Sequence, residues 1–120
     1  MKNLENRRIR YLQDALPIRL GGLASNLSRL ASFSKHAGSQ QVVAEIFLES
    51  RWFIEWTARE LEILQAAELV ELQVKLALWD FESRQNWNDE SWRNALVSKA
   101  TQWSQRVLEM SGLLTTRVAA

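Results

Sequence analysis

The residues that interrupt helices are rare in this chain and stand at few positions. There is one proline, Pro17, and the four glycines fall at three places: Gly21 with Gly22, Gly38, and Gly112. Proline and glycine mark most turns and strand ends in globular proteins, so few such signals remain elsewhere. Apolar residues recur instead at helical spacing along most of the 120 residues. This pattern predicts an all-α fold.

Two leucine-rich seams define the first and last helices. Pro17 lacks a backbone N–H, so the first helix is expected to kink or to restart there. Gly21 and Gly22 each cost about 1 kcal/mol in a helix relative to alanine, which predicts either a break or a close approach of another segment. The apolar residues of the two seams are spaced 4, 3, 4, 3 and 4, 3, 4, 3, 4: Leu16, Leu20, Leu23, Leu27 and Leu30; Leu96, Ala100, Trp103, Val107, Met110 and Leu114.

Turn chemistry predicts short connections. Gly38 suits a left-handed helix end and Ser39 the following N-cap. The second helix is expected over residues 40–57, followed by a restart at Thr57 or a break at residues 63–65, and the third over residues 66–83. The last helix is expected to begin at Asn88, with Trp87 and Trp92 as a hydrophobic staple, and to end at Gly112. Residues 1–120 are therefore expected to form one domain, an antiparallel up-and-down four-helix bundle with a kinked or broken first helix.

The two middle helices carry more apolar surface than one core needs. In the second helix a core face is expected from Val43, Ile46, Phe47, Phe53 and Ile54, while Leu48, Trp52 and Trp56 form a stripe on roughly the opposite side. The third helix has one seam of Leu69, Leu72, Leu76 and Trp79 and another of Val70, Val74, Ala77 and Phe81. Either both helices are buried on two sides, or the extra stripes bind a partner.

Charge and composition narrow the classes of function. The formal net charge is +1, which gives no overall field to attract DNA. There is no cysteine, and no apolar run is long enough for a signal peptide or a membrane span. We therefore expect a soluble, cytoplasmic protein without a cofactor.

Catalytic and metal-binding signals are sparse. The only histidine, His36, stands in a turn, so the carboxylate and Glu-x-x-His ligands of a bundle-type dinuclear iron site are missing. Arg29 and His36 lie in RLASFSKH, which resembles the Arg-x(4–6)-His signature of HEPN-type helical ribonucleases. The resemblance implies that these two residues would act on RNA phosphates at a dimer groove. The alternative is that Arg29 lies on the surface and His36 favours a helix C-terminus by its charge.

The expected function is a non-enzymatic interaction or regulatory module, self-associating as a homodimer or binding another protein through the outer faces of the second and third helices. Tryptophan is a frequent anchor at such interfaces. The alternatives are the ribonuclease above and a bundle that holds an apolar or planar ligand beside Trp79 or Trp103. The expected anchors are Leu48, Trp52, Trp56, Leu72 and Trp79.

Overall fold

In the computed structural model, which describes residues 3–114, the chain is all-helical, as the sequence predicts. The described part contains five α-helices rather than four, because the expected first helix is divided in two. Two short 3-10 segments, η1 (Ala37–Ser39) and η2 (Ala58–Glu60), lie between longer helices. The α-helices are α1 (Leu4–Leu12), α2 (Leu16–Ser34), α3 (Gln40–Thr57), α4 (Ile63–Asn86) and α5 (Glu90–Ser111).

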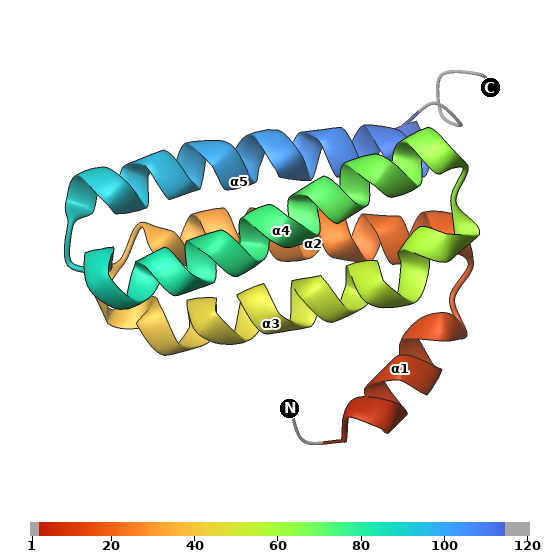
Figure 1. Cartoon of the computed structure of the whole chain (residues 1–120), viewed down its shortest axis with the longest axis horizontal. Coiled ribbons are helices and arrows are strands. Elements are labelled where there is room, and N and C mark those ends of the chain that lie inside the picture. Colours follow the sequence, from red (N-terminus) through yellow and green to blue (C-terminus); the bar gives the residue numbers. More distant parts are fainter. Residues whose placement is uncertain (1–2, 115–120) are drawn as a thin grey trace.

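The break before Pro17 separates α1 from α2. Pro17 stands in the first turn of α2, where its missing N–H is not needed. The restart expected there is therefore confirmed. Figure 1 shows α2, α3, α4 and α5 side by side along the long axis of the molecule, with α1 set apart from them. α1 contributes no buried residue and contacts α3.

The core is built from the seams that the sequence predicts for α2, α3 and α5. α2 packs mainly on α5 and α3, whereas α4 packs more on α3 than on α5. Four leucines of α2, with the expected face of α3 and the α5 seam, supply most of the buried side chains. Among them Leu23, Leu27, Leu30, Phe47, Ile54 and Val107 are fully buried.

The α3–α4 junction differs from the expected capping box. Thr57 ends α3, and its side chain makes no capping bond. The N-cap of α4 is Glu62, whose carboxylate accepts a hydrogen bond from the backbone N–H of Gln65 at 2.9 Å. Thr57 is completely buried, so packing rather than capping determines its place.

The start of α5 is shifted by one residue from the expected position. Asp89, not Asn88, is the N-cap, and its carboxylate accepts hydrogen bonds from the N–H groups of Ser91 and Trp92 at 2.9 and 3.3 Å. A charged acceptor is favoured at the positive end of a helix. Trp87 belongs to the end of α4, where its indole N–H donates to the carbonyl of Ala37 at 2.6 Å. The predicted staple is therefore wrong.

Only one of the two expected left-handed glycines adopts that conformation. Gly112 has φ 77° at the end of α5, as predicted. Gly38 lies within η1 and does not have positive φ, because the α2–α3 connection turns through a 3-10 segment instead.

The paired glycines of α2 differ in their surroundings, which yields a prediction. A Cβ at Gly21 would lie 3.1 Å from Leu113 Cδ1, whereas a Cβ at Gly22 would meet nothing within 4 Å. Gly22→Ala should therefore raise the free energy of unfolding by about 0.5 to 1 kcal/mol. Gly21→Ala should gain less, because Leu113 must move. Urea denaturation of both variants measures the difference, and equal gains would show that the contact with Leu113 does not constrain α2.

Candidate functional site

The outward side of α4 carries an uncovered apolar stripe, which we call the outer seam. Its residues lie within about 40° of Val74 on either side when the helix is viewed down its axis. Five of its side chains are 48 to 81% exposed, although all are large and apolar. The outer seam consists of Ile63, Ala67, Val70, Val74, Leu78 and Phe81.

The opposite side of α4 is the core seam, and it changes the assignment of two expected anchors. Leu69, Leu72 and Leu76 are completely buried and Trp79 is 5% exposed. The prediction that Leu72 and Trp79 lie on an outer face is therefore wrong, because the leucine-rich side of α4 packs into the core. The second seam named from the sequence contains the exposed residues Val70, Val74 and Phe81.

The expected stripe of α3 is only partly accessible. Leu48 and Trp52 are half-buried, whereas Trp56 is 8% exposed. The rings of Trp52 and Trp56 stack with centroids 5.8 Å apart, and Tyr11 of α1 lies 5.9 Å from Trp56 on another side. Trp56 is therefore covered by α1 and by its neighbour, and its expected exposure is corrected. Leu48 and Trp52 remain candidate contact residues.

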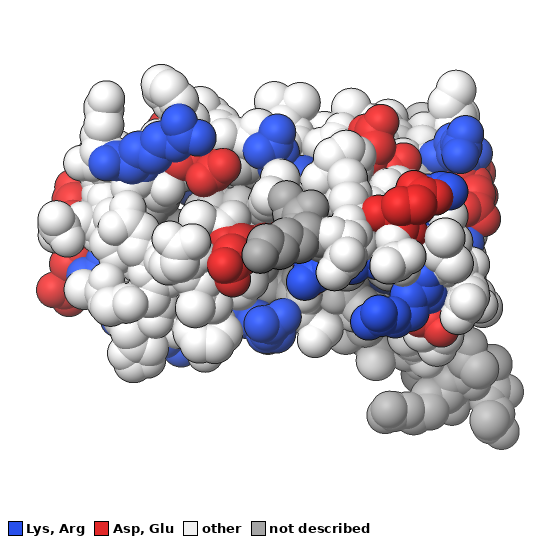
Figure 2. All heavy atoms as spheres, turned by 90° about the horizontal axis from the view of Figure 1, so that it is seen from below, with Lys and Arg blue, Asp and Glu red and all other residues white. Residues whose placement is uncertain are grey.

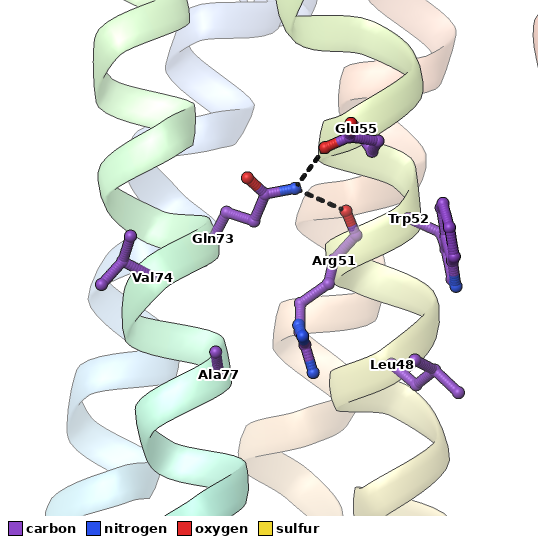
Figure 3. A pocket seen from close by; sticks show the side chains of 7 residues that line it. All are labelled: Leu48, Arg51, Trp52, Glu55, Gln73, Val74 and Ala77. Atoms are coloured by element: carbon purple, nitrogen blue, oxygen red, sulfur yellow. Dashed lines mark hydrogen bonds between the residues drawn. The ribbon is translucent and has the colours of Figure 1, made fainter.

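A shallow groove of about 400 Å³ lies on the surface between α3 and α4. Figure 3 shows Gln73 of α4 reaching across to α3, where its amide donates to the carbonyl of Arg51 at 3.2 Å and to Glu55 at 3.0 Å. Arg51 also lies 3.8 Å from the carboxylate of Asp80. These interactions join α4 to α3 and fix the position of one helix surface relative to the other. The groove is lined by Leu48, Arg51, Trp52, Glu55, Gln73, Val74 and Ala77.

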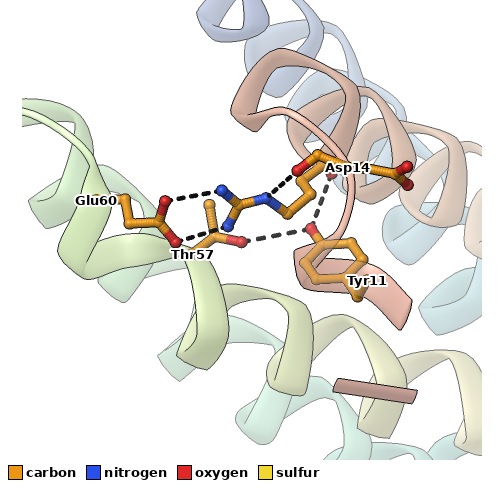
Figure 4. A network of polar contacts seen from close by, with 5 residues as sticks. Tyr11, Asp14, Thr57 and Glu60 are labelled. Atoms are coloured by element: carbon orange, nitrogen blue, oxygen red, sulfur yellow. Dashed lines mark hydrogen bonds and ion pairs between the residues drawn. The ribbon is translucent and has the colours of Figure 1, made fainter. Parts of the chain in front are cut away.

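A polar network fixes the connection between α1 and α2. The buried guanidinium of Arg19 donates two hydrogen bonds of 2.8 Å to the carboxylate of Glu60 and one of 3.0 Å to the carbonyl of Asp14 (Figure 4). The Tyr11 hydroxyl donates to the carbonyl of Arg19 at 2.8 Å. The Arg19 hydrogen bonds lower the pKa of Glu60, and burial raises the pKa of Tyr11 to about 12. This network holds α1 over the aromatic end of α3.

The two residues of the ribonuclease resemblance lie in different settings. Arg29 donates to Asn26 Oδ1 at 3.2 Å and lies 6.0 Å from the centre of the Phe33 ring. It borders a groove of about 460 Å³ whose lining does not include His36. His36 is exposed in the extended residue before η1. The groove beside Arg29 therefore lacks the histidine that phosphate chemistry of that kind would use.

The indoles expected to line a ligand cavity belong to the core. Trp79 is buried within the main cluster, and Trp103 packs against it. Within residues 3–114 no group of three or more His, Cys, Asp or Glu side chains could hold a metal ion. In that same part of the chain, no helix is long and apolar enough to cross a membrane.

Charges of both signs are dispersed over the surface near α3. Figure 2 shows Lys and Arg interspersed with Asp and Glu on the side seen from below, without an extended region of one charge on that face. Two cross-helix ion pairs, Arg7 with Glu49 and Arg106 with Glu68, join α1 to α3 and α5 to α4. Such a mixed surface does not favour a polyanion such as DNA.

Sequence reasoning missed three residues of the outer seam, Ile63, Ala67 and Leu78, which were not in the second seam named for this helix. Leu78 and Ile63 are 51 and 81% exposed, and no residue of the outer seam was among the expected anchors. Their signal was present in the spacing, since Ile63, Ala67, Val70 and Val74 follow one another at intervals of 4, 3 and 4. In comparisons with known proteins, no protein-family model, no curated protein and no solved structure matches the chain.

Proposed function

We propose that this chain is a non-enzymatic interaction module that self-associates through the outer seam of α4 and the adjoining surface of α3. The observation that carries the proposal is the continuity of the outer seam: Val70, Val74, Leu78 and Phe81 follow one another on one side of a helix and all are about half exposed or more. A soluble monomer seldom leaves such a contiguous apolar stripe in water.

The spacing of the outer seam supports a helical partner. Intervals of three and four residues are those by which one α-helix packs against another, with each apolar side chain entering a gap on the facing helix. The exposed seam therefore suits another helix, and a second copy of α4 supplies one.

The core seam explains how the module keeps its outer seam in place. We infer that α2, α3, α4 and α5 form an antiparallel up-and-down four-helix bundle, with α1 as an additional strap. In such a bundle α4 is anchored by its leucines, and its outward residues need not contribute to folding. A rigid helix loses little conformational entropy when it binds, which favours association.

Light scattering coupled to size exclusion tests the proposal. We expect the wild-type protein to have twice the 13.9 kDa mass of the chain. Val74→Glu should give the monomer mass, because a symmetric dimer would bury two uncompensated carboxylates, each at a cost of several kcal/mol. Trp52→Glu should weaken the dimer less, since Trp52 lies beside the outer seam rather than within it.

The matched control is Ile18→Glu. Ile18 is 52% exposed on α2 and Val74 is 64% exposed, so the same charge is added at another exposed apolar residue outside the proposed surface. This variant should remain dimeric. A wild-type protein that stays monomeric at high concentration, or an Ile18→Glu protein that dissociates as fully as Val74→Glu, would contradict the proposal.

A further inference from the structure

Five apolar positions of the outer seam, from Ala67 to Phe81, are arranged symmetrically about Val74, whereas Ile63 lies beyond them and has Gln85 at the matching position. Ala67 and Phe81 lie seven residues before and after it, and Val70 and Leu78 lie four before and after it. The intervals from Ala67 to Phe81 are therefore 3, 4, 4 and 3, the same in both directions. A rotation by 180° that reverses the helix direction about Val74 places every one of these apolar positions on another.

Closed homodimers are usually two-fold symmetric, so that residue i of one copy meets residue j of the other and j meets i. We propose that two copies pair through α4 in antiparallel orientation, with the two-fold axis passing beside Val74. This inference rests on the proposed self-association and adds its geometry. In this pairing Val74 meets its own copy, Val70 meets Leu78 of the second copy, and Ala67 meets Phe81 of the second copy.

Side-chain volume favours this orientation. Each large phenylalanine ring faces a small alanine, and two branched aliphatic residues of similar size face each other in between. The distance between the helix axes can therefore stay nearly constant, since large and small residues alternate across the contact. In a parallel pair each residue would meet its own copy, so two Phe81 rings would collide at one end while two Ala67 methyl groups left a gap at the other.

Charge at the border of the outer seam favours the same orientation. Glu71 and Lys75 lie on the α5 side of α4, at about 60° and 100° from Val74 on the helical wheel. A two-fold axis perpendicular to α4 keeps the α5 sides of both copies together and reverses their direction. Glu71 then lies within about one turn of Lys75 of the second copy, and symmetry repeats the pair. A parallel pair would instead place Glu71 nearest Val70 and Gln73 of the second copy, and neither carries a charge.

The same axis accounts for the contribution of α3. Rotation about it leaves α3 of each copy on the same side of the α4 pair. Figure 3 shows Trp52 at about the level of Val74 along the helices. The two Trp52 side chains would therefore lie at the same level, on the sides of the two α3 helices that are turned away from α4.

Cysteine crosslinking tests the orientation, because the chain has no cysteine of its own. A disulfide needs Cα atoms within about 7 Å. In the antiparallel pair the two copies of residue 74 are in reach, whereas the two copies of residue 70 are about 12 Å apart along the axis. Under mild oxidation, Val74→Cys should form a covalent dimer, but Val70→Cys alone and Leu78→Cys alone should not.

The decisive sample is a mixture of the Val70→Cys and Leu78→Cys proteins. Antiparallel pairing predicts that the mixture forms a disulfide heterodimer, at least roughly tenfold faster than either variant alone or than the exposed control Ile18→Cys. Non-reducing electrophoresis and intact-mass measurement distinguish the products. If Val70→Cys and Leu78→Cys each crosslink to themselves, α4 pairs in parallel and the inference is wrong, although the proposed self-association stands.

A charge exchange gives a second readout that does not depend on thiols. Glu71→Lys should weaken the dimer roughly tenfold at low salt, and Glu71→Lys with Lys75→Glu should restore it. A dimer that neither crosslinks through α4 nor responds to these charges would overturn the inference. A monomeric wild-type protein would overturn the proposed function as well, so light scattering distinguishes the two failures.

Discussion

Leu72→Ala should lower the free energy of unfolding by about 3 kcal/mol, while Val70→Ala, two residues away on the same helix, should lower it by nothing measurable. Leu72 is completely buried in the core cluster and Val70 is 48% exposed. Removing the leucine side chain leaves a cavity, and the neighbouring leucines can fill it only partly. Removing the valine methyl groups leaves only solvent, and alanine is the better helix former.

Both variants are best compared by urea denaturation at protein concentrations low enough that self-association does not contribute to stability. At high concentration, light scattering should show that Val70→Ala weakens the dimer more than Leu72→Ala does. The two variants therefore separate the contribution of α4 to folding from its contribution to self-association. Similar losses of stability for the two variants would show that both seams of α4 are buried in solution and would remove the basis of the proposed interface.

The comparison of α4 with α2 shows which part of the fold follows from spacing alone. α2 has one apolar seam, and its leucines from Leu20 to Leu30 are buried as the spacing predicts. α4 has two seams of similar length, and helical period cannot tell which of them faces the core. The choice is made by the packing of α4 on α3, which no local pattern encodes. Leu72 and Trp79 were therefore expected at the wrong face, even though both seams were recognised.

Trp56 illustrates a second limit. Its place on the outward side of α3 follows from the spacing, but its burial depends on α1. A nine-residue helix with no buried residue of its own carries little signal of where it packs. The contact is made by the ring of Tyr11, which packs on Phe53 and Trp56, both far from it in the sequence. Such long-range pairs are determined by tertiary structure and cannot be read from periodicity.

The predicted starts of α4 and α5 were wrong for a more local reason. Asn88 and Asp89 are both good N-cap residues, and they differ by one position. Before α4, residues 57–60 match the pattern of a capping box, but the side chain that accepts a backbone hydrogen bond is that of Glu62. The outer seam is unaffected by these shifts, because its register depends on the helix interior.

The docking of α1 can be measured through the only tyrosine of the chain, Tyr11. Its ring stacks on Phe53 at 4.0 Å between centroids, with planes 6° apart, and its hydroxyl donates to the carbonyl of Arg19. Burial raises the pKa of Tyr11 from its ordinary value of 10.0 to about 12. The near-ultraviolet absorbance of tyrosinate should therefore appear near pH 12 in the native protein and near pH 10 in urea.

The sign of the effect on stability follows from this direction. A pKa that is higher in the folded state contributes stability that is complete below about pH 10 and is lost as the pH rises toward about 12. The interval corresponds to about 2.7 kcal/mol, which partial exposure of the ring reduces to about 1 to 2 kcal/mol. Because the Tyr11 ring is the part of α1 that contacts Phe53 and Trp56, ionisation should weaken the docking of α1 and expose Trp56 before the other helices unfold. Phe53→Ala should bring the Tyr11 pKa back toward its ordinary value, whereas Arg8→Ala, which removes only the exposed ion pair with Glu5, should leave it raised. A native titration centred near pH 10 would show that Tyr11 is in water and that α1 does not cover α3.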